Sequence, residues 1–203
     1  MKKVLLAAAL IAVSTPAFAD GWYADLGGSY QFLQEQSLTG ATVPSGRGEL
    51  AAHDGFGVTT ALGFAYENGL RTEAELGYRR NDLDKISGGG FGTRFTGDLN
   101  GHVSALSGML NLLYDYKTEN KLTPYIGGGI GAADVTVASD RLAVNNDDLN
   151  FAYQFMGGMR YALTDNLSLR AGYRFFATAT PEIQGTQGEY FAHNVELGLT
   201  IGF

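Results

Sequence analysis

Apolar and polar residues alternate most regularly at the C-terminal end of the chain, over residues 190–203. Every second position from Phe203 back to Phe191 is apolar except His193, and the positions between them are mostly small or polar. Because successive side chains of a strand point to opposite faces, this pattern predicts a strand with one apolar and one polar face. The alternation outlasts an ordinary strand of about 5–6 residues. It suits a tilted strand that crosses a bilayer, which needs about 9–11 residues.

The same alternation recurs in earlier segments, so the chain is predicted to be all-β with eight strands. The predicted strands are residues 21–33, 55–66, 70–80, 102–115, 124–135, 150–161, 167–176 and 190–203. The fourth and fifth strands are the least regular. Met109 and Leu113 fall on the polar face of the fourth, and one face of the fifth is mostly glycine. The pattern therefore leaves the register of these two strands open.

The connections between the predicted strands alternate between long and short. Segments 34–54, 81–101, 136–149 and 177–189 are long and polar, whereas 67–69, 116–123 and 162–166 are short. The first short connection contains Asn68-Gly69, a strong hairpin signal between alternating runs. An even number of strands, with short turns at one end and long loops at the other, is typical of outer-membrane barrels. The sequence therefore predicts an eight-stranded antiparallel up-and-down transmembrane β-barrel.

Aromatic residues on the predicted apolar faces gather toward the two ends of the strands. The short-turn end receives Trp22, Tyr66, Tyr114 and Tyr161, and the long-loop end receives Tyr30, Phe56, Tyr78, Phe151, Phe175 and Phe191. Amphipathic rings collect at both interfaces of a bilayer. A soluble sandwich or a lipocalin-like barrel has no reason to sort its aromatic residues in this way. The two belts favour a membrane barrel.

The N-terminal end has the pattern of an export signal. Lys2 and Lys3 precede an apolar run over residues 4–13, and Ala17 and Ala19 form a small-x-small cleavage site. Residues 1–19 are therefore predicted to be a cleaved signal peptide, with an ordinary N-terminal helix as the alternative. The run is too short to span a membrane, which takes about 20 residues. Residues 20–203 have the length of one domain.

Composition supports an exported barrel and argues against one class of partner. Glycine makes up 29 of the 203 residues, about twice its ~7% average usage. Cysteine is absent, so an exported protein of this sequence has no disulfides. The formal net charge of −7 argues against a nucleic-acid partner, which would require a basic face.

The whole pattern resembles the small bacterial outer-membrane barrels of the OmpA, OmpX and opacity-protein type. Residues 124–131, with the sequence Pro-Tyr-Ile-Gly-Gly-Gly-Ile-Gly, and 172–175, Gly-Tyr-Arg-Phe, resemble strands five and seven of that family. The terminal Phe203 resembles the signal that the barrel-assembly machinery reads. The resemblance spans residues 20–203 and implies a place in the cell outer membrane, in contact with its lipids and lipopolysaccharide. The peptidoglycan-binding domain of OmpA-type proteins would follow Phe203, so that role is not expected.

Charged residues on the predicted inward faces are the main candidate site. They are Asp25, Arg71, Glu73, Glu75, Arg79, Asp115, Arg160, Arg170, Arg174 and Glu196. The interior of an eight-stranded barrel is just wide enough for side chains to fill it, and an unpaired buried charge is costly. These charges are therefore predicted to form a salt-bridged plug. The alternative is a polar path for small solutes.

Residues suited to catalysis or metal binding are sparse. The histidines are His53, His102 and His193. Small barrels that deacylate lipid A carry a Ser two residues after a lipid-facing His, and Val195 stands in that place here. The acidic segment 140–148 offers oxygen ligands for Ca²⁺ but lacks the spacing of an EF-hand. No catalytic residue, metal site or cofactor is predicted.

Together these features predict a non-enzymatic outer-membrane protein. Its barrel would anchor and display four extracellular loops, in a role in membrane integrity, in adhesion or as a surface antigen. The loops would carry any contact with a host or surface ligand. A narrow porin-like channel is the alternative, and a lipid-modifying enzyme is a remote one.

Overall fold

The computed structural model describes residues 21–33, 36–38, 48–90, 93–139, 143–144, 149–178, 182–183, 186–187 and 190–203, with side chains described within 21–32, 54–81, 102–136, 149–178 and 191–203. The strands are β1 (Gly21–Leu33), β2 (Gln36–Leu38), β3 (Gly48–Ala65), β4 (Leu70–Gly90), β5 (Thr93–Asp115), β6 (Leu122–Ser139), β7 (Ala143–Val144), β8 (Leu149–Ala162), β9 (Leu167–Thr178), β10 (Glu182–Ile183), β11 (Thr186–Gln187) and β12 (Tyr190–Gly202). No helix within these described ranges is long and apolar enough to cross a membrane.

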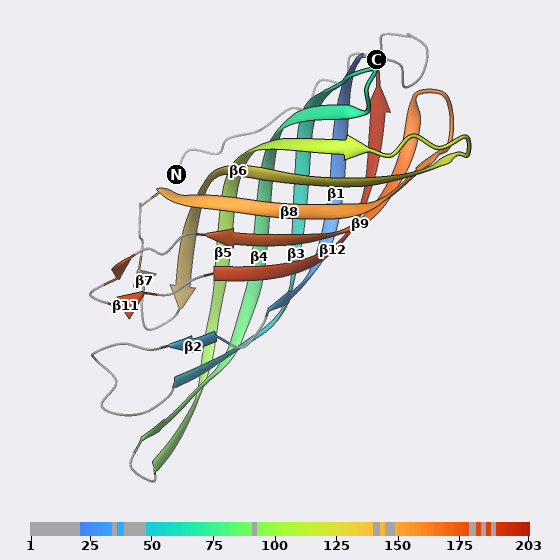
Figure 1. The fold of residues 1–203 in the computed structure, drawn as a ribbon. Coiled ribbons are helices and arrows are strands. Elements are labelled where there is room, and N and C mark those ends of the chain that lie inside the picture. Colours follow the sequence, from blue (N-terminus) through green and yellow to red (C-terminus); the bar gives the residue numbers. More distant parts are fainter. Residues whose placement is uncertain are drawn as a thin grey trace.

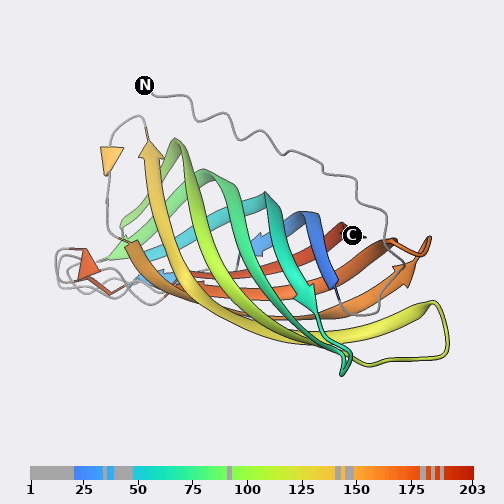
Figure 2. The ribbon, with the colours of Figure 1, turned by 90° about the horizontal axis from the view of Figure 1, so that it is seen from above.

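Eight long strands form one closed sheet (Figure 1). Neighbours pair antiparallel in the order β1, β3, β4, β5, β6, β8, β9 and β12, and β12 pairs back with β1. Leu26 of β1 lies opposite Thr60 of β3 on one side and Leu199 of β12 on the other. Figure 2 shows this seam, with β1 in blue beside β12 in red. Closure gives every long strand a paired neighbour on both sides of the barrel wall, as a bilayer requires. The predicted eight-stranded antiparallel barrel is confirmed.

Side chains alternate between the interior and the outer wall along each long strand. On β4, Arg71 and Glu73 are buried while Thr72 and Ala74 are exposed. Large apolar side chains on the outer wall are strongly exposed, and Leu110 has a relative exposure of 68%. Apolar residues outside and polar residues inside are the arrangement of a membrane barrel.

The register of β5 and β6, which the sequence left open, places Met109 and Leu113 inside the barrel. Met109 lies opposite Gly131, and Leu113 lies opposite Gly127. A Cβ on Gly131 would come within 2.7 Å of the Met109 sulfur, and one on Gly127 within 2.7 Å of Leu113 Cγ. The glycine-rich inner face of β6 therefore makes room for the larger side chains of β5.

The predicted boundaries at the long-loop end need correction. β3 begins at Gly48 rather than at residue 55, β4 continues to Gly90 rather than ending at 80, and β5 begins at Thr93 rather than at 102. Gly90 lies opposite Thr93, so the predicted loop 81–101 is wrong and most of it is a paired hairpin (Figure 1, green, at the lower end). A strand that extends beyond the membrane needs no apolar face. The sequence of residues 81–101 is polar and glycine-rich and therefore resembles a loop, although most of its backbone is paired.

The other three predicted loops are also shortened by strand pairing. β2 pairs with the first residues of β3, and β6 runs to Ser139 and pairs with β7. In 177–189, β9 extends through Thr178, and β10 pairs with β11. The register shifts beside Ala52 and between Leu83 and Lys85, and such bulges bend and twist a strand. The rest of these segments, including most of the acidic segment 140–148, lies outside the described residues.

The short-turn end is closed by tight connections. Gly69 has φ of 87°, a left-handed value that favours glycine, and its N–H donates to Tyr66 O at 3.0 Å. The predicted Asn68-Gly69 hairpin is confirmed. At the same end, the Phe203 N–H donates to Trp22 O at 3.0 Å. This contact ties the end of the last strand to the start of the first.

Candidate functional site: the charged lumen

The ten charged residues predicted to face inward all lie in the barrel interior, on β1, β4, β5, β8, β9 and β12. Nine of them are buried, and Asp115 is partly buried at the short-turn end. They form three layers, here named lower, middle and upper from the short-turn end to the long-loop end.

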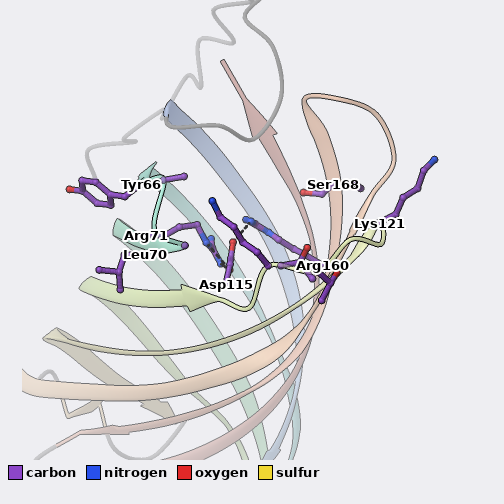
Figure 3. Close-up of a pocket in the computed structure, with 13 residues that line it drawn as sticks. Tyr66, Leu70, Arg71, Asp115, Lys121, Arg160 and Ser168 are labelled. Carbon is purple, nitrogen blue, oxygen red and sulfur yellow. Dashed lines mark hydrogen bonds and ion pairs between the residues drawn. The ribbon is translucent and has the colours of Figure 1, made fainter.

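The lower layer is built around Asp115. Arg71 Nη2 lies 3.0 Å from Asp115 Oδ1, and Arg160 Nη1 lies 2.9 Å from Oδ2 of the same carboxylate (Figure 3). Arg71 also pairs with Glu73 at 2.9 Å. The Tyr23 hydroxyl donates to Glu73 at 2.7 Å and accepts from Arg71 at 3.1 Å. Two guanidinium groups therefore share two carboxylates across this end of the lumen.

The middle layer joins β9 to both strands at the barrel seam. Arg170 binds Asp25 with two hydrogen bonds of 2.7 and 3.2 Å and pairs with Glu196 at 2.8 Å. Thr200 donates to Asp25 at 2.6 Å. Glu196 lies between two arginines, because its second oxygen is 2.7 Å from Arg174 Nε. Forked arginine–carboxylate contacts of this kind are strong and specific in geometry.

Arg174 carries the middle layer across the lumen to β4. Its Nη1 donates to Glu75 and, at 3.0 Å, to Gln154. Glu75 also accepts from Asn111 at 3.1 Å, and Gln154 donates to Asn111 at 2.7 Å. Neutral amides thus add hydrogen bonds to the buried charges of this layer, which helps to offset the cost of burying them.

The upper layer combines a cation with apolar side chains. The Arg79 guanidinium lies 4.0 Å from the centre of the Phe176 ring and donates to Ser107 at 2.8 Å. Phe176 packs with Met109, Ala133 and Ala152 in one buried apolar cluster. A second cluster joins Leu113, Tyr125 and Met156. Side chains of both kinds therefore line the described interior and contact one another across it.

Sequence reasoning did not single out the neutral members of this network. Tyr23, Asn111, Gln154, Thr200 and Phe176 all contact charged residues inside the barrel. The sequence contains the information needed to find them, because the alternation along each strand places all five on inward faces. Only the charges were selected, since an unpaired buried charge is the more expensive group.

Aromatic side chains of the predicted belts lie on the outer wall. Trp22, Tyr66, Tyr114 and Tyr161 are exposed, as are Tyr30, Phe56, Tyr78 and Phe151, whereas Phe175 and Phe191 are half-buried. Rings also meet edge to face across strands, as Trp22 and Phe64 do at 5.5 Å between centroids. Phe175 and Phe191 are stacked at 5.9 Å.

The two histidines whose side chains are described lie apart from the lumen network. His193 is on the outer wall, where its Nδ1 bonds the Tyr173 hydroxyl and its ring lies 5.4 Å from that of Phe175. His102 lies near the middle of β5, opposite Asp82 of β4, and the side chain of His53 is outside the described residues. Within the described residues, no group of His, Asp or Glu is arranged to hold a metal ion.

Known proteins share this fold and sequence pattern. Residues 5–203 match the family model described as outer membrane protein beta-barrel domain. An outer membrane protein of Gluconacetobacter diazotrophicus is 30% identical over 92% of this chain, and the outer membrane protein PagN of Salmonella typhimurium is 28% identical over 71%. The aligned regions span 54% and 64% of those relatives, so this chain covers little more than half the length of the first.

Among solved structures, Neisserial surface protein A superposes with a TM-score of 0.60 and 16% identity, covering 90% of this chain and 97% of that protein. That likeness supports the fold. With a family model that spans nearly the whole sequence, the chain belongs to the outer membrane protein beta-barrel domain family and is a protein of the outer membrane.

Proposed function

We propose that this protein is a closed, non-enzymatic scaffold that anchors surface structures in the outer membrane. The observation that carries this proposal is the network of side chains that cross the lumen. Two layers of paired charges, an upper layer in which Arg79 lies over the Phe176 ring, and two apolar clusters cross the described interior. Removing one partner of a buried pair is strongly destabilising, so these side chains hold one another in place. A conducting path would require several of the pairs to separate together.

The displayed surface lies at the long-loop end, which faces the cell exterior in barrels of this kind. The β4–β5 hairpin continues past Asn81 to Gly90 and Thr93, and β2, β7, β10 and β11 mark three further connections at that end. Binding residues are commonly carried on loops held by a rigid scaffold. We assign contact with a host or surface ligand to these four connections. Phe203 is the proposed signal for the barrel-assembly machinery. The aromatic belt at the long-loop end is the proposed contact with lipopolysaccharide.

Planar-bilayer conductance tests the closed lumen. The refolded wild-type barrel should show no steady conductance, whereas the double variant Glu75→Ala/Arg174→Ala should conduct. This change removes the Arg174–Glu75 and Arg174–Glu196 pairs without altering the net charge of the lumen. Leu110→Ala, which removes volume from the lipid-facing wall, is the matched control and should stay closed. Steady conductance by the wild type at the nanosiemens level would favour the narrow pore instead.

A shortened hairpin tests the display role. Replacing residues 83–101 by a two-residue Asn-Gly turn joins the paired residues Asp82 and His102, removes the projecting part of β4 and β5 and leaves the barrel-spanning part. The variant should still fold, as judged by its heat-dependent shift on gels, and should lose binding of surface antibodies raised against the wild type. Undiminished recognition would place the displayed surface elsewhere.

The enzymatic alternative has little support from the histidine on the outer wall. His193 is bonded to Tyr173, and Val195 stands where a lipid A deacylase would carry its serine. This alternative can be tested by measuring the mass of lipid A from cells that express the barrel. An unchanged mass supports a non-enzymatic scaffold, and loss of an acyl chain that depends on His193 contradicts it.

A further inference from the structure

A hollow of about 240 Å³ opens at the short-turn end of the barrel, beside the lower layer (Figure 3). Its wall is formed by the ends of β3, β4, β5, β6, β8 and β9 and by the turns between them. This end faces the periplasm in barrels with short periplasmic turns. Neither the proposed plug nor the proposed display surface assigns a role to this hollow.

Among the charged side chains that line the hollow, cations outnumber anions. Arg71, Arg160, Lys117 and Lys121 contribute four positive charges, and Asp115 contributes the one carboxylate among the lining residues. This concentration contrasts with the formal net charge of −7 for the whole chain. The neighbouring turns also carry Glu67, Glu119 and Asp165, which are exposed and do not line the hollow.

The two lysines are the cations available to a ligand. Arg71 and Arg160 are already paired with Asp115. Lys117 donates to the backbone carbonyl of Glu67, and Lys121 extends from the rim toward solvent (Figure 3). Neither lysine forms an ion pair with any described residue. Both ammonium groups are therefore available for a direct contact with an anion.

A buried hydroxyl provides an independent indication of a polar ligand. Ser168 has a relative exposure of 2%, lines the hollow and points into it (Figure 3). Its oxygen has no hydrogen-bond partner within the described part of the chain. Buried hydroxyl groups in folded proteins are nearly always hydrogen-bonded. The site therefore offers a donor beside the cations.

The frame of the hollow is fixed by backbone contacts. The Asp115 N–H donates to Gly69 O at 2.8 Å, and the Ala162 N–H donates to Lys121 O at 2.9 Å. Thr118 Oγ1 donates to Leu122 O at 2.6 Å. On the side of the outer wall, the hollow is lined by Tyr66, whose ring is exposed toward the membrane. The hollow is therefore built before a ligand arrives and lies next to the inner leaflet.

We propose that this hollow binds a phosphate group. Lys117 and Lys121 would attract the anion, and Ser168 would donate a hydrogen bond to one of its oxygens. Lysine is a common phosphate binder as a point charge. The phosphate can be carried by a phospholipid headgroup of the inner leaflet or by a small phosphorylated solute of the periplasm, and the two sources can be distinguished.

Two titrations of the full barrel test the site. In phosphate-free maltoside micelles, inorganic phosphate is added and the amide resonances of Gly69 and Lys117 are followed by NMR. In nanodiscs of a phosphate-free galactolipid, phosphatidylglycerol is added as the probe. Saturable shifts with inorganic phosphate indicate a soluble ligand. Shifts with phosphatidylglycerol alone indicate a headgroup, and the absence of saturable shifts in both systems overturns the proposal.

Variants connect the shifts to the residues. Lys117→Gln should weaken binding about tenfold, the scale of a hydrogen bond to a charged group. Ser168→Ala, which removes no charge and no ion pair, should weaken it about threefold or more. Arg80→Gln is the matched control, because it removes one positive charge from β4 beyond Tyr78, toward the opposite end of the barrel. Equal affinities in the wild type, Lys117→Gln and Ser168→Ala would overturn the assignment, as would an equal loss in Arg80→Gln.

Discussion

Glu196 offers the sharpest test of the plug, because one carboxylate binds two arginines. Its oxygens lie 2.8 Å from Arg170 Nη1 and 2.7 Å from Arg174 Nε, and its side chain is 3% exposed. Glu196→Gln keeps the size of the side chain and removes its charge. The variant therefore changes the electrostatics of the middle layer while leaving its packing nearly intact.

The size of the effect follows from what each arginine retains. Breaking a buried ion pair by removing one partner costs about 3–5 kcal/mol. Two pairs are lost, but Arg170 keeps Asp25 and Arg174 keeps Glu75, so the two losses are not additive. We expect the free energy of unfolding to fall by about 3–5 kcal/mol in total. The double variant Glu196→Gln/Arg174→Gln restores the charge balance and should lose less than the sum of its single changes.

Urea unfolding in lipid vesicles measures this change. Trp22 is the one tryptophan of the chain, so its fluorescence reports the lower rim without labelling. Glu119→Gln is the matched control, since it makes the same chemical change in an exposed turn, where substitutions usually stay within about 0.5 kcal/mol. If Glu196→Gln behaves like Glu119→Gln, the lumen charges do not hold the barrel together, and the proposal of a plug must be abandoned.

Three further predictions concern the wall and the turns. Leu110→Arg on the lipid face should lower the free energy of unfolding by up to about 2–4 kcal/mol if Leu110 lies near the midplane, whereas Glu119→Arg in the exposed turn should have little effect in the same urea assay. Gly69→Ala should lower the free energy of unfolding by about 1–3 kcal/mol, because φ is 87° and the new Cβ would lie 2.7 Å from Asp115 O. Gly28→Ala is its control and should cost less, since the added Cβ meets no atom within 4 Å. Equal losses in the two variants would contradict the reasoning. Nitroxide labels on single cysteines at 195–202 should show oxygen accessibility with a period of two residues, and a period near 3.6 would rule out the strand.

The wall of the barrel could be predicted from the sequence because a bilayer imposes a simple rule. Each strand that crosses it must alternate between lipid and lumen, and this rule located all eight long strands and their order. It also identified the inward side of Arg71, Glu73 and Glu75 from parity alone. The partners of these residues could not be predicted, because Arg174 and Glu75 are far apart in the sequence and meet only through the tilt and register of the closed sheet.

The rule fails where the membrane ends. Residues 82–90 and 93–101 have no apolar face, so periodicity did not separate them from a loop, yet their backbones pair through most of their length. The same limit applies inside the barrel to Met109 and Leu113, which are apolar at inward positions. They lie opposite glycines of β6, which leave room for them inside the barrel. That room can be recognised only when the register between β5 and β6 is known.

The long β4–β5 hairpin also has a mechanical consequence. Nine residues of β4, 82–90, continue past Asn81, and at ~3.3 Å per residue they extend about 30 Å along the strand. The tip is therefore joined to the membrane-spanning wall by continuous strands, without a flexible linker. A force on the tip is shared by the backbone hydrogen bonds of both strands and passes directly into the closed sheet. When a partner bound to this hairpin pulls on the cell, the whole barrel therefore resists the force.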